Sequence, residues 1–223
     1  VVSAFDAQDG KSLWVLRRPS APLTLLQAGV LGAFKDTLLV GQGPKLAGVD
    51  PLQGTLRWEV AVATPRGANE VERLSDLLAP IARVGDVVCA RAFQNAVGCV
   101  NAERGPIVWT RKVGGNQGIA GDAQIVVGAD GSDRITAWRM LDGEVAWTSE
   151  KLLYRELSAP LLVGRTAIFG DVEGIVHFLA KEDGKALLRL TTDGSPITTA
   201  PALSDKTVLV VTSSGGLFAF RPE

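Results

Sequence analysis

The sequence predicts an all-β protein built from repeated four-stranded sheets, and the main reason is a short sequence motif that recurs along the chain. In the clearest copy, Asp50 ends an apolar strand, Gly54 closes a polar turn and Trp58 follows four residues later. Glycine supplies the positive φ that such a hairpin turn requires without steric cost. The glycines of successive copies are 44, 51, 38 and 41 residues apart, and a period of about forty indicates a propeller or a solenoid. The copies are Asp6–Gly10–Trp14, Asp50–Gly54–Trp58, Asn101–Gly105–Trp109, Arg139–Gly143–Trp147 and Ala180–Gly184–Leu188, the last of which lacks the tryptophan.

Two further observations favour a propeller over a solenoid of helices. No stretch keeps a 3.6-residue apolar period over ten residues. The strand before each turn is apolar in both of its alternating columns, as expected for a sheet packed between two others. A second strand and a short apolar piece precede it, so the tryptophan strand completes a four-stranded unit. The predicted fold is therefore a β-propeller of four-stranded blades with tryptophan repeats. The tryptophans are interpreted as packing residues between blades, each burying ~150–250 Å².

The repeat predicts one array of blades, because each blade buries its faces against its neighbours. Residues 1–29 are expected to hold the end of one blade, and residues 196–223 an incomplete last blade. These end pieces overlap by one strand, so we expect an arc of about five blades from a larger ring, the alternative being a five-bladed ring with a redundant strand. Because the chain starts at Val1 without an initiator methionine or signal peptide, we expect it to be processed or truncated. The complete blades are expected at residues 30–60, 79–111, 117–149 and 158–190.

Composition excludes several classes of function. The net charge is −1, so the chain has no excess of positive charge of the kind that binds nucleic acid. No run approaches the ~18 apolar residues of a membrane helix. A histidine occurs only at His177, in the middle of an expected strand, so a packing role is expected and no Ser/His/Asp triad is predicted. No cluster of acidic or amide residues has metal-ligand spacing, and neither a metal nor a cofactor is expected.

The two cysteines, Cys89 and Cys99, are expected to remain reduced. A turn at Gln94–Asn95 would pair Cys89 with Val100 and Ala90 with Cys99 across a hairpin. Directly paired residues share a face of the sheet, so this register sends the two thiols to opposite faces.

The connector from Ala61 to Leu78 is long and carries both charged and apolar residues. A long charged loop on a rigid scaffold is a frequent location of function. The alternative is a solvated insertion with a helical turn at Asn69–Leu74. From the residues alone, both interpretations remain open.

This connector and the repeats around it resemble the BamB family, the eight-bladed propeller lipoproteins of the bacterial β-barrel assembly machinery (BAM complex). Glu70-Val71-Glu72-Arg73-Leu74-Ser75-Asp76 is similar to the family's E-[IV]-[DE]-R-L-S-D-V-D stretch. Supporting matches are Leu152–Arg155 and Gly170–Gly174. The resemblance covers essentially the whole chain, from about the third blade to the eighth, and implies that the first blades and a lipid-bearing N-terminal cysteine are absent.

The resemblance implies a non-enzymatic scaffold on the periplasmic face of the outer membrane. Its partner would be the BamA-type barrel subunit, with unfolded outer-membrane proteins as further candidates, and membrane association would come only through the lipid anchor. The implied partner-binding residues are Arg73, Leu74, Ser75, Asp76, Leu23 and Leu25.

Details of this implied surface depart from the family pattern. Leu78 replaces the family's second acid, and Leu26 replaces an arginine, so the surface is expected to be more apolar. We expect Asp76 to accept hydrogen bonds from the partner, and Arg73 to reach the partner or to pair with Glu70 or Asp76.

Two other classes are weighed against the scaffold. A quinoprotein dehydrogenase also has eight blades with tryptophan repeats, but requires a calcium-bound quinone, an acidic base and usually adjacent cysteines, whose pattern this sequence lacks. A periplasmic ligand-sensing propeller would require converging polar groups on the propeller axis, which the sequence does not supply.

Overall fold

The structure is a computed structural model that describes residues 1–17, 23–27 and 29–221. Within these ranges the chain forms antiparallel sheets and no helix. The first sheet has two strands, the next four have four strands each, and the last has three. They are β1 (Val2–Phe5) and β2 (Ser12–Leu16); β3 (Leu31–Phe34), β4 (Thr37–Gln42), β5 (Lys45–Val49) and β6 (Leu56–Ala61); β7 (Leu77–Val84), β8 (Val87–Ala92), β9 (Ala96–Asn101) and β10 (Ile107–Arg111); β11 (Ala120–Gly121), β12 (Ile125–Ala129), β13 (Ile135–Arg139) and β14 (Val145–Ser149); β15 (Leu161–Val163), β16 (Thr166–Gly170), β17 (Ile175–Ala180) and β18 (Ala186–Thr191); β19 (Ala202–Ser204), β20 (Thr207–Val211) and β21 (Leu217–Phe220).

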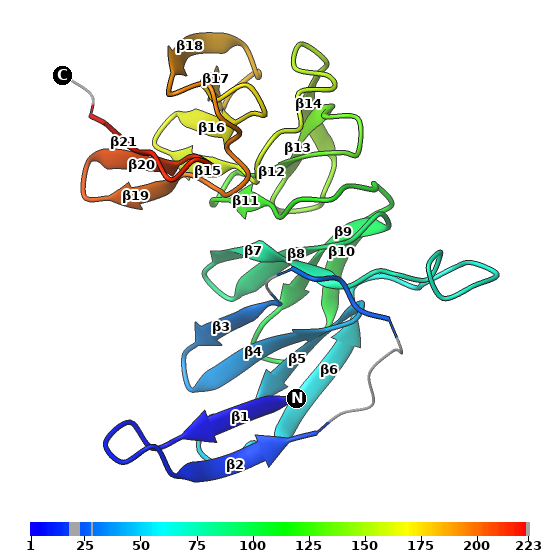
Figure 1. Ribbon diagram of the computed structural model, residues 1–223. Helices are drawn as coiled ribbons and strands as arrows, with labels where there is room; N and C mark the ends of the chain where they lie inside the picture. Colours follow the sequence, from blue (N-terminus) through cyan, green and yellow to red (C-terminus); the bar gives the residue numbers. More distant parts are fainter. Residues whose placement is uncertain (18–22, 28, 222–223) are drawn as a thin grey trace.

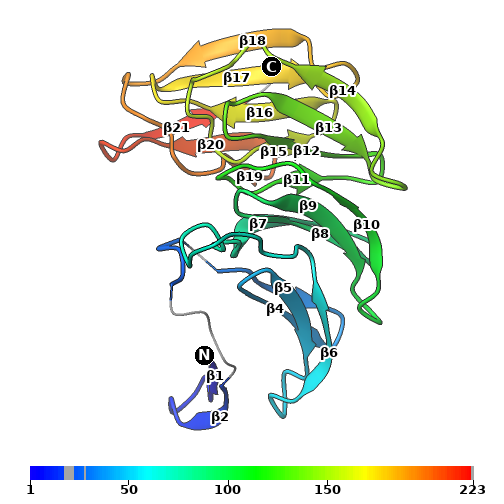
Figure 2. The same cartoon turned by 90° about the vertical axis from the view of Figure 1, so that its right-hand side faces the viewer.

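The sheets follow one another as blades along an open curve (Figures 1 and 2). Within each complete blade the strands pair in chain order, so the first strand lies at one edge and the tryptophan strand at the other. The edge strands β7, β11, β15 and β19 of successive blades contact one another, which places them on the inner side of the curve. This arrangement confirms the predicted all-β propeller class.

The hydrophobic core is divided between the blades. Five apolar clusters are present, and each lies between one sheet and the next. The cluster between the third and fourth sheets, for example, joins Val97 and Cys99 of β9 to Val126 of β12 and Trp138 of β13. Apolar residues on both faces of a strand are therefore required, because each blade is covered on both sides.

The recurring glycine and tryptophan of the sequence motif contact each other between neighbouring blades. The tryptophan of one blade packs against the turn glycine of the next blade. A Cβ atom on Gly143 would lie 2.5 Å from the Trp109 ring, and one on Gly54 would lie 2.6 Å from the Trp14 ring. Both glycines also have φ of +71°. The position therefore requires glycine for two reasons: a side chain would clash with the tryptophan ring, and the positive φ disfavours other residues. The same packing joins Trp58 to Gly105 and Trp147 to Gly184.

Indole hydrogen bonds reinforce this packing. Nε1 of Trp109 donates to the carbonyl of Met140 at 2.9 Å, and Nε1 of Trp147 donates to the carbonyl of Lys181 at 2.8 Å. In the first interface, Nε1 of Trp14 donates to the carbonyl of Pro51 at 2.9 Å. Each of these bonds crosses from one blade to the next, so the tryptophan repeat sets the spacing between blades.

The expectation of two reduced cysteines is wrong. In β8 and β9, Cys89 pairs directly with Cys99, and the two form a disulfide with Cα atoms 3.9 Å apart. The hairpin loop has three residues between the paired Ala92 and Ala96, with Gln94 at φ 49°. A three-residue loop shifts the register by one position relative to the expected two-residue turn, and this shift brings both sulfur atoms to the same face.

Candidate functional site

The connector between β6 and β7, residues 62–76, is the most prominent projection from the blades. Figure 1 shows it extending away from the sheets at the level of the third blade. Residues 64–73 are exposed, whereas Ser75 and Leu77, where the connector joins β7, are buried. The connector is therefore anchored at its base and free along its tip.

The tip of the connector is closed by its own hydrogen bonds. Glu72 accepts the amide of Ala68 at 2.7 Å, and its own amide donates to Oδ1 of Asn69 at 2.9 Å. The side-chain amide of Asn69 donates back to the Glu72 carboxylate at 2.9 Å. The segment expected as a helical turn, Asn69–Leu74, forms a hydrogen-bonded turn in which the Leu74 amide donates to the Val71 carbonyl.

Gly67 is required at the start of this turn. Its φ is +154°, and a Cβ atom there would lie 2.3 Å from Cβ of Glu72. Nε of Arg73 donates to the Gly67 carbonyl at 3.0 Å. The expected pairing of Arg73 with Glu70 or Asp76 is wrong for the described residues, since Arg73 holds the loop through the backbone of Gly67 and forms no ion pair with either acid.

Asp76 joins the connector to a second segment that lies far away in the sequence. Its Oδ2 atom accepts the amide of Leu25 at 2.7 Å. Its carbonyl accepts the amide of Phe93 at 2.9 Å, which ties it to the β8–β9 turn. The structure therefore brings together the two stretches implied by the family resemblance, but it gives Asp76 a partner within the chain.

A cavity of about 270 Å³ lies where the two stretches meet. Its wall combines Leu23 and the Gly43–Pro44 turn with residues of the connector, among them Arg73, Leu74, Ser75 and Asp76. Pro65 and Glu70 complete the lining.

Exposed apolar side chains occur on both of the stretches that form this cavity. Leu26 is fully exposed, at 105% of its reference area, and Leu23 and Val71 are also exposed. Leu25 and Leu74 are half-buried. Leu23 and Leu74 line the cavity, whereas Leu26 and Val71 lie on the same two stretches outside its lining; we call these four side chains the apolar rim. The sequence did not single out Val71, and an exposed Val on a connector turn leaves no periodic signal that could have done so.

Leu78 is not part of this surface. It is 1% exposed and lies in β7, so the expectation that it makes the partner surface more apolar is wrong. The position belongs to a strand that is covered by its neighbours. Ser75 is also buried, and its hydroxyl donates to the Arg73 carbonyl at 3.1 Å; this side chain shapes the turn from inside.

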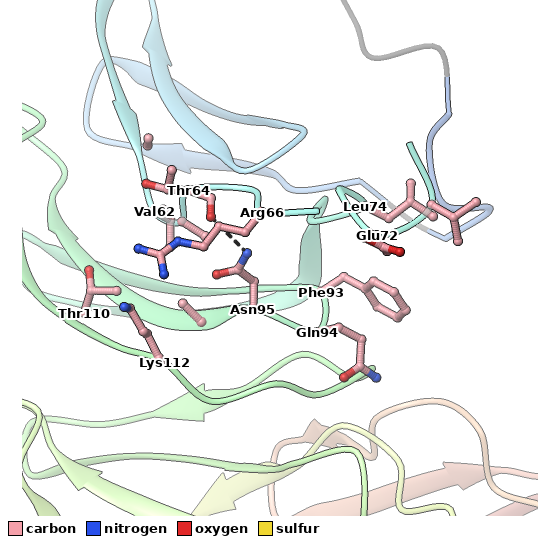
Figure 3. Close-up of a pocket in the computed structure, with 14 residues that line it drawn as sticks. Val62, Thr64, Arg66, Glu72, Leu74, Phe93, Gln94, Asn95, Thr110 and Lys112 are labelled. Carbon is pink, nitrogen blue, oxygen red and sulfur yellow. Dashed lines mark hydrogen bonds between the residues drawn. The ribbon is translucent and has the colours of Figure 1, made fainter. Parts of the chain in front are cut away.

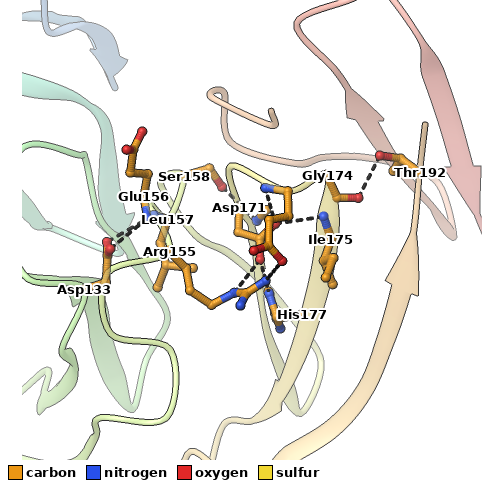
Figure 4. A network of polar contacts seen from close by, with 12 residues as sticks. Asp133, Arg155, Glu156, Leu157, Ser158, Asp171, Gly174, Ile175, His177 and Thr192 are labelled. Carbon is orange, nitrogen blue, oxygen red and sulfur yellow. Dashed lines mark hydrogen bonds and ion pairs between the residues drawn. The ribbon is translucent and has the colours of Figure 1, made fainter. Parts of the chain in front are cut away.

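A second polar cluster surrounds His177, the only histidine of the sequence. Oδ2 of Asp171 is 2.8 Å from Nε2 of His177 and 2.6 Å from Nε of Arg155 (Figure 4). Burial lowers the pKa of His177, although the neighbouring carboxylate opposes this effect. Burial acts to raise the pKa of Asp171, but the hydrogen bonds from His177, the Ile175 amide and Arg155 outweigh it, and the net shift is downward.

This arrangement holds a neutral imidazole that donates to an ionised carboxylate, which is also paired with a guanidinium. Asp171 is completely buried and His177 is 1% exposed, so the cluster offers no open face to a substrate. The packing role expected for His177 is what the structure gives it. In the described ranges there is no group of three or more His, Cys, Asp or Glu residues that could hold a metal ion, and no helix capable of crossing a membrane.

The successive four-stranded blades, joined by tryptophans that pack on turn glycines, define this chain as part of a β-propeller. The family model described as "Outer membrane protein assembly factor BamB" matches residues 1–149. This chain therefore belongs to the BamB family. That result agrees with the resemblance carried by the connector at residues 70–76.

Individual relatives give the same result. The chain is 37% identical to the outer membrane protein assembly factor BamB of Burkholderia pseudomallei and 33% identical to that of Bordetella pertussis, in each case over 99% of this chain and 58% of the relative. The crystal structure of BamB from Moraxella catarrhalis superposes with a TM-score of 0.89 at 20% identity, over 97% of this chain and 65% of that one. The chain thus spans little more than half the length of the curated relatives it matches.

Proposed function

We propose that this chain is part of a non-enzymatic scaffold that assists the assembly of outer-membrane β-barrel proteins on the periplasmic face of the outer membrane. The relatives are named outer membrane protein assembly factors, and family membership supports the same role here. In the full-length protein a lipid anchor would hold the propeller at the membrane. The partner we propose is the BamA-type barrel subunit of the assembly machinery.

One observation carries the proposed partner surface: the 2.7 Å hydrogen bond from the Leu25 amide to Asp76 holds two distant stretches around one cavity. The apolar rim on these stretches exposes large aliphatic side chains to solvent. Burying such side chains at the centre of an interface contributes more to affinity than burying charged groups at its edge. We therefore propose that Leu23, Leu26, Val71 and Leu74 contact the partner.

In this proposal three residues position the two stretches and do not contact the partner themselves: Asp76, Ser75 and Leu25. The Asp76 carboxylate holds the Leu25 backbone, so that Leu23 and Leu26 lie beside the connector. Arg73 fixes the turn through Gly67 and leaves the rest of its guanidinium for the partner.

The apolar rim is tested by binding to the periplasmic part of the barrel subunit from the same organism. Leu26→Asp should weaken binding by about thirtyfold, since an anchor residue at an interface typically contributes ~2 kcal/mol. Leu52→Asp is the matched control, because Leu52 is exposed on the β5–β6 turn and lies outside the proposed surface. Equal affinities for the two variants would refute the proposed surface.

A second series separates the positional role of Asp76 from a direct charge contact. Asp76→Asn keeps an oxygen that can accept the Leu25 amide, whereas Asp76→Ala removes it. If Asp76 acts by position, the Asn variant should bind within about threefold of the parent, and the Ala variant should lose about tenfold. Asp76→Arg should abolish capture with unchanged circular dichroism. If Asn binds as weakly as Ala, the partner reads the charge directly and the positional role is wrong.

A further inference from the structure

A second and larger cavity lies on the other side of the connector, between its first residues and the β8–β9 turn. Its volume is about 540 Å³, which is within the ~300–1,000 Å³ typical of cavities that hold a ligand of several chemical groups. Figure 3 shows the side chains that surround it. None of its lining residues except Leu74 also lines the smaller cavity at Leu23.

Apolar residues form one part of the cavity wall, which we call its floor. Val62 and Ala63 at the start of the connector and Ala96 at the start of β9 are buried. Phe93, in the β8–β9 turn, is half-buried beside them. A ligand that enters the cavity therefore meets aliphatic and aromatic surface at its base.

Two cations stand at the mouth without a neutralising partner. Arg66 of the connector and Lys112, which follows β10, both line the cavity and are exposed. In Figure 3 the guanidinium of Arg66 and the ammonium group of Lys112 extend over the same side of the hollow. Neither forms an ion pair with any described residue. The one acid in the lining, Glu72, keeps its negative charge but lies beside Leu74, away from the two cationic groups (Figure 3), where its carboxylate accepts the Ala68 amide and the Asn69 side-chain amide.

Neutral hydrogen-bonding groups complete the lining. The Thr110 hydroxyl and the Gln94 side-chain amide line the cavity and make no hydrogen bond to the described residues. Asn95 donates to the Thr64 carbonyl at 3.3 Å, which holds the connector against the β8–β9 turn. Hydroxyl and amide groups are suited to the N–H and C=O groups of a peptide.

We propose that this cavity binds an acidic peptide segment, with a carboxylate between Arg66 and Lys112 and an adjacent apolar side chain on the floor formed by Val62, Ala63 and Ala96. Two like charges facing one hollow attract an anionic occupant and disfavour a basic one. The apolar floor and the neutral hydrogen-bonding groups favour a peptide over a single inorganic anion. This inference goes beyond the proposed function, because it concerns a different cavity and a different class of contact.

The test uses this chain alone and a fluorescein-labelled peptide of alternating valine and aspartate. The probe should bind saturably, as measured by fluorescence anisotropy at low ionic strength. The same peptide with asparagine in place of aspartate should bind about tenfold more weakly, since two exposed ion pairs are lost. Raising the salt concentration should weaken the aspartate peptide and leave the asparagine peptide nearly unchanged.

Matched variants locate the site. The double variant R66E/K112E should lose the preference for aspartate. The double variant R104E/K151E changes the net charge by the same amount at two exposed positions outside the cavity and should keep that preference. Circular dichroism checks that both variants fold.

Three results would overturn the proposal: equal binding of the two peptides, an unchanged preference in R66E/K112E, or an equal loss in R104E/K151E. Anionic phospholipid vesicles serve as a separate arm. Vesicle binding that depends on Arg66 and Lys112, with no peptide binding, would assign the cations to a membrane surface and also refute the peptide site. None of these outcomes depends on the barrel subunit, so they are distinguishable from failure of the proposed function.

Discussion

Two connectors of similar polarity do opposite things in this molecule. The connector between β14 and β15, residues 150–160, is held by the blades on both sides of it. Asp133 accepts the amides of Glu156 and Leu157 at 2.8 and 3.1 Å, and Asp171 accepts the Arg155 side chain. The connector between β6 and β7, residues 62–76, satisfies the polar groups of its tip mainly within itself.

The difference shows that the source of the hydrogen-bond partners decides the role of a polar loop. A connector whose polar groups are paired with neighbouring blades is part of the framework, because moving it leaves buried groups unpaired. A connector closed on itself can present its outer side chains to another molecule at little cost to the fold. Both contain arginine and acidic residues, so composition alone does not distinguish them.

The largest effect is expected from Asp171→Ala, which removes the buried carboxylate that holds Arg155 of the connector between β14 and β15. The change leaves the Arg155 guanidinium and His177 without their shared carboxylate. Removing one partner of a buried ion pair typically costs ~3 kcal/mol, which corresponds to a fall in Tm of roughly 6–12 °C for a domain of this size. Thermal unfolding measures this. Glu70→Ala on the other connector is the control and should stay within ~0.5 kcal/mol; equal losses would remove the distinction between the connectors.

A smaller effect is expected from Asp133→Ala. This carboxylate accepts two backbone amides and has no cationic partner among the described residues, so its removal leaves only amide groups unpaired. The free energy of unfolding should fall by ~2 kcal/mol. Trypsin should also cleave faster after Lys151 and Arg155, because the connector loses both bonds to Asp133 and keeps at the β12–β13 turn only that from the Tyr154 amide to the Ser132 carbonyl. Unchanged cleavage would show that Asp133 is not required to hold the connector in place.

The framework cluster also predicts a pH dependence. Burial lowers the pKa of His177 below its usual 6.5, with Arg155 and Arg189 acting in the same direction and Asp171 opposing them. The unfolded chain therefore binds the proton more readily than the folded chain. Stability is complete above about pH 6.5 and falls as the pH drops below that value, by at most ~1.4 kcal/mol per pH unit for one proton.

Urea unfolding between pH 7.5 and 5 measures this slope. His177→Gln removes the titrating group and should flatten the curve in that range. The pKa of Asp171 is also lowered, from 3.8, so its contribution is lost only at still lower pH. If the free energy of unfolding of His177→Gln still falls with pH in this range, another titrating group is responsible for the slope.

The framework of the molecule follows from local patterns that the sequence displays. Alternating apolar strands, turn glycines and tryptophans at a constant offset all repeat with the blade, so the fold class could be predicted. The connector at residues 62–76 could be predicted as a candidate site because its length interrupts that period. The contact between Gly143 and Trp109 in neighbouring blades explains why the two residue types repeat together.

What could not be predicted depends on single backbone conformations and on contacts between loops. Gln94 adopts a positive φ without being glycine, and it lies in the three-residue loop that sets the register joining Cys89 to Cys99. The bond from Leu25 to Asp76 joins residues 51 positions apart, and no periodicity encodes a contact between two connectors. The residue type alone also does not predict whether Arg73 donates to a carboxylate or, as the structure shows, to the backbone carbonyl of Gly67.

The smallest effect is expected from Arg73→Ala in the self-closed connector. Arg73 is exposed and makes one hydrogen bond, to the Gly67 carbonyl. Surface substitutions of this kind change the free energy of unfolding by less than ~0.5 kcal/mol, so Tm should move by no more than about 2 °C. The turn should nevertheless open more often, because it loses the side-chain bond from Arg73 that holds its first residue, Gly67. Trypsin cleavage after Arg66 should therefore become faster, while cleavage after Lys151 stays the same.

Arg73→Lys distinguishes the two roles that Arg73 has in this connector. A lysine ammonium can replace the single hydrogen bond to Gly67, but it lacks the planar guanidinium that would meet a partner. If the arginine only closes the turn, the lysine variant should restore both the cleavage rate and the affinity for the barrel subunit. If it also contacts the partner, cleavage should be restored while affinity remains several-fold lower. A fall in Tm of either variant as large as that of Asp171→Ala would show that this connector, too, belongs to the framework.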